Sequence, residues 1–198
     1  QGTAAVGSMV VFEQGVPSKK LYRRFNIRSV VGPDDFASME EVLMRRFRRW
    51  QGAQEAHALG EKPDSAFALL PDLLIVAGGK GQLSRAGTVL EHFDLLGKVP
   101  VAGLAKQEEE LFLPGRSESL LLPRHSQALY LVQRVRDEAH RFAITAHRKR
   151  RTRAGLSSLL DTIPGIGPVR RKALVTHFGS LEKIRKASLD ELVGVPGI

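Results

Sequence analysis

The stretch Leu73-Leu74-Ile75-Val76-Ala77-Gly78-Gly79-Lys80-Gly81-Gln82-Leu83 is a continuous apolar run that ends in two glycines. A short apolar run of this kind is typical of a strand buried on both faces of a sheet. A helix from about Gln82 to Leu96 and a second buried strand, Val99–Leu104, are predicted after it. Strand, helix and strand in this order predict a parallel pair, and therefore an α/β fold.

The residues before this unit predict a β-hairpin and a long helix. Residues 6–13 and 20–31 alternate as strands do, with turn-forming residues 14–18 between them. Asp34 and Asp35 can cap a following helix, whose apolar positions recur every three or four residues: Phe36, Met39, Leu43, Phe47 and Trp50. The four arginines of this helix, Arg45, Arg46, Arg48 and Arg49, are expected away from most of that stripe. Residues 51–70 are rich in Gly, Ala and polar residues and are expected to be a variable excursion.

The residues after the unit predict two short edge strands and a capping helix. The strands are expected at Glu110–Leu113 and Leu120–Leu122, and the amphipathic helix at Ser126–His147. The predicted organisation is a sheet domain over 1–150, a basic linker over 151–155 and a small helical domain over 156–198.

The helical domain contains the clearest motif for binding a ligand. A helix must end near Ile163, a tight turn follows over Pro164–Gly167, and Pro168 suits the first turn of the next helix. Glycines let a backbone approach a ligand closely, and free amides at a helix start attract anions. This helix-hairpin-helix pattern predicts contact with a DNA phosphate through Gly165, Ile166, Gly167, Arg170, Arg171 and Lys172. A second copy begins at 192–198 and includes Gly194 and Gly197. The simpler reading is a helical turn tightened by glycine.

The net charge of +9 is concentrated in one part of the chain. Residues 141–172 hold nine Lys and Arg against one acid, Asp161, for a local balance of +8. Nucleic acid is the natural partner of such a segment, because each neutralised phosphate releases counterions. A basic surface that serves solubility alone is the alternative.

Composition narrows the remaining possibilities. No apolar stretch approaches a membrane span and no signal-peptide pattern opens the sequence, so a cytoplasmic protein is expected. The chain has no cysteine, which excludes thiolate ligands and leaves carboxylates, histidines and water for any metal. Oxygen-rich sites of this kind favour Mg²⁺ or Mn²⁺. Residues 78–81 lack the spacing and the Ser/Thr of a P-loop, so no nucleotide site is expected.

Several segments occur in the order found in one family of proteins: residues 7–12, Tyr22–Phe25, Gly32–Met39, Gly78–Leu83, Arg136–Ala143 and the two hairpins. On these segments the whole sequence resembles the C-terminal half of the UvrC family, the nuclease subunits of bacterial nucleotide excision repair. The resemblance implies an RNase H-like mixed sheet flanked by helices, followed by a tandem helix-hairpin-helix domain. It also implies incision 5′ to a lesion in damaged double-stranded DNA, with UvrB as partner and UvrA acting earlier in the pathway.

The resemblance implies an active site of two aspartates and one histidine around a divalent metal. This sequence departs from that pattern at both aspartates. The first aspartate is expected a few residues before Gln1. The second corresponds to Ala77, which cannot bind a metal, so an inactive copy is expected, through engineering or natural loss. His140 matches the histidine, as a metal ligand or as a donor to the scissile phosphate. Lys80 is expected either to approach a phosphate or to be a solvated loop lysine, and Asp34 and Asp35 are assigned to helix capping.

Two functions remain open from the sequence. One is a metal-dependent endonuclease half, disabled in this copy. The other is a non-catalytic DNA-binding module that positions repair partners. Ala77 favours a non-catalytic DNA-binding module for this chain. His140 favours an endonuclease for the protein from which this chain derives.

Overall fold

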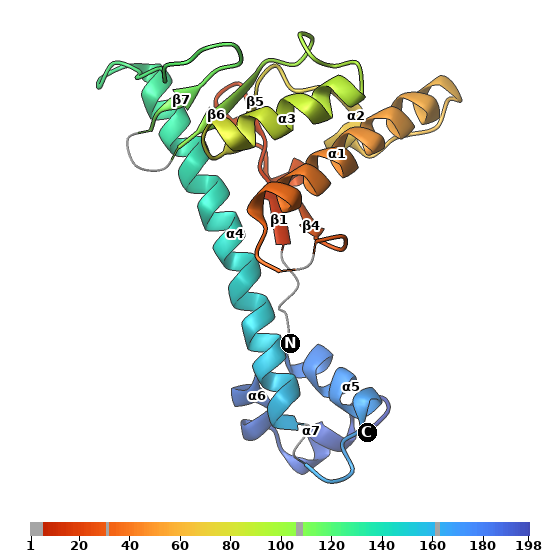
Figure 1. Cartoon of the computed structure of the whole chain (residues 1–198). Helices are drawn as coiled ribbons and strands as arrows, with labels where there is room; N and C mark the ends of the chain where they lie inside the picture. Colours follow the sequence, from red (N-terminus) through yellow and green to blue (C-terminus); the bar gives the residue numbers. More distant parts are fainter. Residues whose placement is uncertain (1–5, 31, 106–108, 161–162) are drawn as a thin grey trace. The chain divides into compact units, whose positions relative to one another are not determined.

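The computed structural model describes residues 6–30, 32–105, 109–160 and 163–198. For residues 146–159 and 181 it describes the backbone alone. Contacts divide the chain into a first unit, Gln1–Ala143, and a second unit, Ile144–Ile198. Figure 1 shows the elements of each unit. The first unit has the mixed α/β architecture that the sequence predicts, and the second is helical.

The first unit begins with two small antiparallel pairs. Strand β1 (Val6–Met9) pairs with β4 (Arg23–Asn26), and β2 (Phe12–Glu13) pairs with β3 (Val16–Pro17). A 3₁₀ turn, η1 (Lys19–Leu21), leads into β4. The predicted hairpin is therefore present, with a second, smaller hairpin inside its connection.

Helix α1 (Asp35–Ala58) starts where the sequence predicts it. Asp34 caps it by accepting a hydrogen bond from the amide of Ala37 at 3.0 Å. Leu43 and Phe47 enter the core. The expected excursion over 51–70 is wrong, because α1 continues to Ala58 and a short helix, α2 (Ser65–Ala68), follows with Phe67 1% exposed.

Arg46 is buried, contrary to the expectation that the arginines of α1 lie away from its apolar stripe. Its Nη2 donates to the carbonyl of Leu69 at 2.6 Å, and its guanidinium lies 5.2 Å from the ring centroid of Phe47. Burial lowers the pKa of Arg46 to about 10. The long side chain reaches a backbone carbonyl that helical periodicity cannot reveal.

The main sheet has the order β5-β6-β7. Strand β5 (Leu74–Ala77) runs parallel to β6 (Val101–Leu104), and β7 (Leu111–Phe112) is antiparallel to β6. Helix α3 (Lys80–His92) connects β5 to β6. It begins two residues before the predicted start and ends four before the predicted end. The second expected edge strand is reduced to one bridge, between Leu111 and Leu120.

Helices cover both faces of this sheet. Val76 and Val101 pack in one cluster with residues of α1 and α3. Ala102 and Leu104 pack on the other face with Val132 of helix α4 (Gln127–Leu160).

Helix α4 is longer than predicted. The expected end at His147 is wrong, and the residues expected as a linker, 151–155, lie within the helix. Because arginine and lysine are good helix formers, the basic run does not interrupt the helix. The side chains of Arg148, Lys149, Arg150, Arg151 and Arg153 lie outside the described residues.

The second unit adds three further helices, α5 (Pro168–Phe178), α6 (Leu181–Lys186) and α7 (Leu189–Val193). Leu160, Leu174 and Val195 form its core, each at most 3% exposed. Ile163, which the motif predicts as part of the apolar frame, is 46% exposed. No helix in the described part of the chain is long and apolar enough to cross a bilayer.

Candidate nuclease and DNA-binding sites

Ala77 is the last residue of β5 and is exposed. It pairs with Leu104 in the register of β5 and β6, so its Cβ lies on the same face of the sheet as the side chain of Leu104. That face is covered by α4 through Val132. A side chain at position 77 therefore emerges at the carboxyl edge of the sheet, on the side of α4. This is where α/β sheets place ligand-binding groups.

Arg136 lies at the same edge of the sheet. It follows Val132 by one helical turn, and its guanidinium forms ion pairs with Glu109 and Asp137. Glu109 lies near the end of β6. The backbone carbonyl of the next residue, Glu110, accepts a hydrogen bond at 3.0 Å from the amide of Ala105, the residue directly after β6. The sequence places Arg136 beside His140, four residues before it on the same helix, but assigns it no role.

His140 is exposed and lies one further turn along α4, on the side of the helix that carries Arg136. Tyr22 of the first hairpin fixes this segment of α4: its hydroxyl donates to Oε1 of Glu138 at 3.0 Å, and its ring lies 5.1 Å from that of Phe142. Tyr22 thus holds the segment of α4 that carries His140 through Glu138 and Phe142, while the exposed His140 lies on another side of the helix.

Glu138 has strong partners. Hydrogen bonds from Arg141, at 2.6 Å, and from Tyr22 outweigh burial and lower the pKa of Glu138 from 4.5 to about 2. Burial, together with the Glu138 carboxylate, raises the pKa of the Tyr22 hydroxyl to about 12. The hydroxyl thus stays a donor at all physiological pH values.

Replacing Glu138 by glutamine should lower the free energy of unfolding by about 1 kcal/mol at pH 7, because charge-assisted hydrogen bonds are lost. Since the folded-state pKa is depressed, the contribution is present above pH 4.5 and disappears as the pH falls toward 2. Urea unfolding at pH 7 and pH 3 measures this. Glu138→Gln should show a smaller acid loss than the parent. Asp137→Asn, whose carboxylate is 67% exposed, is the control and should change less. An unchanged acid response in Glu138→Gln would contradict the role given to this network.

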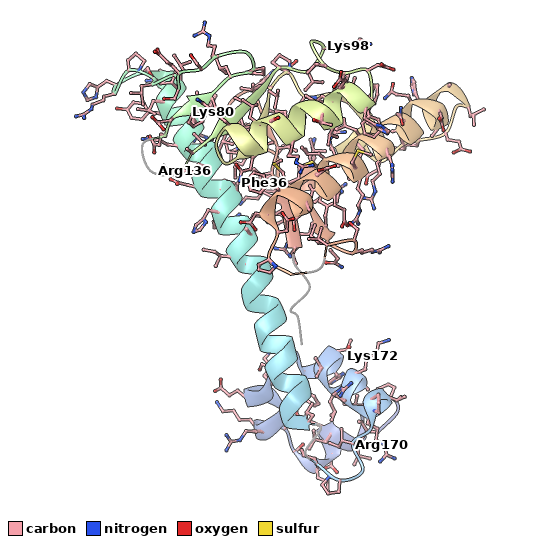
Figure 2. All side chains as sticks on the ribbon, viewed as in Figure 1. Phe36, Lys80, Lys98, Arg136, Arg170 and Lys172 are labelled. Carbon is pink, nitrogen blue, oxygen red and sulfur yellow. The ribbon has the colours of Figure 1, made fainter. Side chains whose placement is uncertain are left out.

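Lys80 is the first residue of α3 and is exposed at the same strand end, two residues after Gly78. Gly78 has φ +140°, and its amide donates to the carbonyl of Leu104 at 2.9 Å. Figure 2 labels Lys80 and Arg136 in the part of the first unit where α3 begins.

The metal site that the family resemblance implies lacks a carboxylate at position 77. Within the described ranges there is no group of three or more His, Asp, Glu or Cys side chains that could hold an ion. Ala77 offers no ligand atom where the family resemblance has a carboxylate. Asp34 is used as a helix cap, as the sequence predicts.

The second unit contains two turns of the same geometry. In residues 163–166 the amide of Ile166 donates to the carbonyl of Ile163 at 3.2 Å, and in 195–198 the amide of Ile198 donates to that of Val195 at 3.1 Å. Each turn has proline second and glycine third, and Gly165 and Gly197 have φ of +86° and +92°. These are the features of a type II turn, which requires glycine at its third position. The tandem arrangement of the hairpins is thereby visible in the backbone.

Gly167 differs from Gly165. It caps α5 with φ −79° and ψ 179°, which any residue adopts, and a Cβ there would meet nothing within 4 Å. The backbone geometry of the turn therefore does not require glycine at position 167. Gly194 is also not a turn glycine of this kind: it ends α7 with φ −68°.

The start of α5 offers free amides. Gly167 provides no side-chain cap, and Pro168 has no N–H. The amides of Val169 and Arg170 are therefore the donors without an intrahelical acceptor. Arg170 and Lys172 are exposed nearby, and Nη1 of Arg170 donates to the carbonyl of Gly165 at 3.2 Å (Figure 2).

Two family models match this chain. Residues 1–144 match the model of the UvrC RNase H endonuclease domain. The chain belongs to the UvrC family. Residues 157–198 match a SAM-like helix-hairpin-helix tandem.

The UvrC relatives are similar along the whole chain. UvrABC system protein C of Moorella thermoacetica is 49% identical over 198 residues, that of Dehalococcoides mccartyi 51%, and that of Methanosphaera stadtmanae 48% over 197 residues. Each match covers all of this chain and 30%, 31% and 32% of the respective relative. The chain thus spans about a third of the length of the UvrC proteins it matches.

Proposed function

We propose that the first unit is the part of an excision nuclease that cuts DNA on the 5′ side of a lesion, and that this copy is inactive. The observation that carries the proposal is the place of Ala77, exposed at the carboxyl end of β5 and on the side of α4. Family resemblance expects an aspartate at this position. His140 and Arg136 lie farther along the helix that covers the same face.

The proposed activity of the parent depends on a divalent metal, Mg²⁺ or Mn²⁺, held in part by an aspartate at position 77. Hard cations of this kind prefer carboxylate oxygen. The described residues of this chain do not supply such a set. We assign the missing carboxylate to an engineered Asp-to-Ala change or to natural loss, which the encoding gene distinguishes.

The second candidate function is a non-catalytic DNA-binding module that positions repair partners. The observation in its favour is the same Ala77. Nicking of a lesion-containing duplex by a chain extended upstream of Gln1 and carrying Ala77→Asp separates the two. A protein that only binds DNA should gain no nicking activity from this substitution.

The proposed DNA-binding site lies in the second unit. The amides at the start of α5 would bind a phosphate beside Gly165, Ile166 and Gly167, with Arg170, Arg171 and Lys172 adding positive charge. The turn of Gly197 would present a second phosphate contact, after Gly194 at the end of α7.

Binding of DNA should be sensitive to salt and largely independent of sequence, because amides and basic side chains address phosphates rather than base edges. With about four phosphates contacted, affinity should fall about a hundredfold between 50 and 200 mM salt. Fluorescence anisotropy with two unrelated duplexes of equal length measures this. A flat salt response, or a strong preference for one sequence, would count against the proposed contacts.

The proposed partners are damaged double-stranded DNA and UvrB, with UvrA acting earlier, in the cytoplasm. The relatives are named as components of a UvrABC system, which supports this assignment. We further propose a sheet domain over 1–150, a basic connection over 151–155 and a DNA-binding domain over 156–198. No nucleotide cofactor and no membrane partner are proposed.

A further inference from the structure

Phe36 of α1 is more exposed than the other residues of the apolar stripe of this helix. Phe36 is 42% exposed, whereas Leu43 and Phe47 of the same helix are 6% and 0% exposed. Among the described residues, Phe36 is not part of the core cluster formed by α1, α3 and the sheet. Its exposure is therefore not explained by packing of the core.

The ring of Phe36 is held against the start of α3. A Cβ built on Gly81 would lie 2.6 Å from Cε1 of Phe36, so the missing side chain of Gly81 makes room for the ring. Asp34 caps α1 two residues before Phe36, which fixes the backbone that carries the ring. The ring of Phe36 is thus exposed, and its position is fixed by the first residues of α1 and of α3.

Phe36 contacts the start of α3, which follows the end of β5. Gly81 follows Lys80 directly and Ala77 by four residues, around the end of β5. Figure 2 labels Phe36 and Lys80 near the start of α3. An exposed ring and the exposed cation Lys80 therefore lie near the end of β5, the strand that carries position 77.

An aromatic ring next to cations suits a nucleotide that is not base-paired. Proteins bind single-stranded nucleic acid by stacking bases on aromatic rings while basic groups hold the phosphates. In an intact duplex the bases already stack on one another, so a protein ring gains access to a base face only where the duplex is open. We propose that Phe36 stacks on an unpaired base next to the phosphate to be cut, so that locally opened DNA is the preferred substrate. This inference rests on the proposed nuclease function of the first unit.

The test uses the chain as it is and requires no cutting. Two DNAs of equal length are compared, a duplex and a duplex with a central unpaired stretch. The parent should bind the opened DNA about tenfold more tightly. Phe36→Leu, which keeps an apolar contact with Gly81 but cannot stack, should lose most of that preference. Phe36→Tyr should keep it.

A second readout locates the ring. The chain has one tryptophan, so Phe36→Trp adds a single new fluorophore. Its emission should fall on addition of the opened DNA and change little with intact duplex. Tyr130 is 43% exposed in the first unit, which makes Tyr130→Leu and Tyr130→Trp matched controls without an effect.

The outcomes separate this inference from the proposed function. Salt-sensitive binding with no preference for opened DNA, unchanged in Phe36→Leu and without quenching in Phe36→Trp, would overturn stacking and leave the nuclease proposal standing. If the parent bound neither DNA, the proposed function itself would fail.

Discussion

A chain carrying Gly167→Val should bind duplex DNA at least about tenfold more weakly than the parent and remain folded. Gly167 has an extended backbone and an unobstructed Cβ position, so valine fits without strain in the free protein. The valine side chain would stand beside the amides of Val169 and Arg170, where a phosphate is proposed to bind. Hydrogen bonds to charged groups contribute about 1.5–3 kcal/mol each, and every 1.4 kcal/mol is a factor of ten.

Two comparisons make the Gly167 experiment specific. Gly165→Ala should weaken binding and also lower the stability of the second unit, since Gly165 has φ +86°. Lys149→Ala removes one cation from the basic run and should reduce affinity less than Gly167→Val. If Gly167→Val bound as tightly as the parent while Lys149→Ala did not, charge along the basic run would explain the affinity, and the hairpin site would be wrong.

The elements that depend on local sequence were predictable. The Asp34 cap, the stripe of Leu43 and Phe47, and the strand-helix-strand unit around Gly78 each follow from spacing within a few residues. Resemblance to the UvrC family added the RNase H-like type of the α/β fold and the importance of position 77, which composition and periodicity alone could not give.

Features that depend on tertiary contacts were not predictable. Arg46 is buried because it reaches the carbonyl of Leu69, and Phe67 is buried because α2 folds back on α1. The pairing of Arg136 with Glu109 joins residues 27 positions apart. Spacing of glycines also could not distinguish Gly165, which needs a positive φ, from Gly167, which does not.

Position 77 has the largest expected effect on activity. The chain with Ala77 should not nick DNA in Mg²⁺ or Mn²⁺, because the described residues offer no ligand set for a metal. Ala77→Asp should restore activity in a longer chain that includes the aspartate expected upstream of Gln1. The substitution places a carboxylate at an exposed strand end, so folding should be unaffected. Ala77→Asn, of the same size but without the charge, is the matched control and should stay at least about a hundredfold less active, since metal sites of this kind depend on anionic oxygen.

The most direct test is nicking of a duplex with one defined lesion, in the presence of UvrB and Mg²⁺, by two longer chains that differ only at position 77. The account predicts cuts on the 5′ side of the lesion with aspartate at position 77 and none with alanine. Robust metal-dependent nicking by the chain with Ala77, or no nicking by a folded, DNA-binding chain with the aspartate, would contradict it.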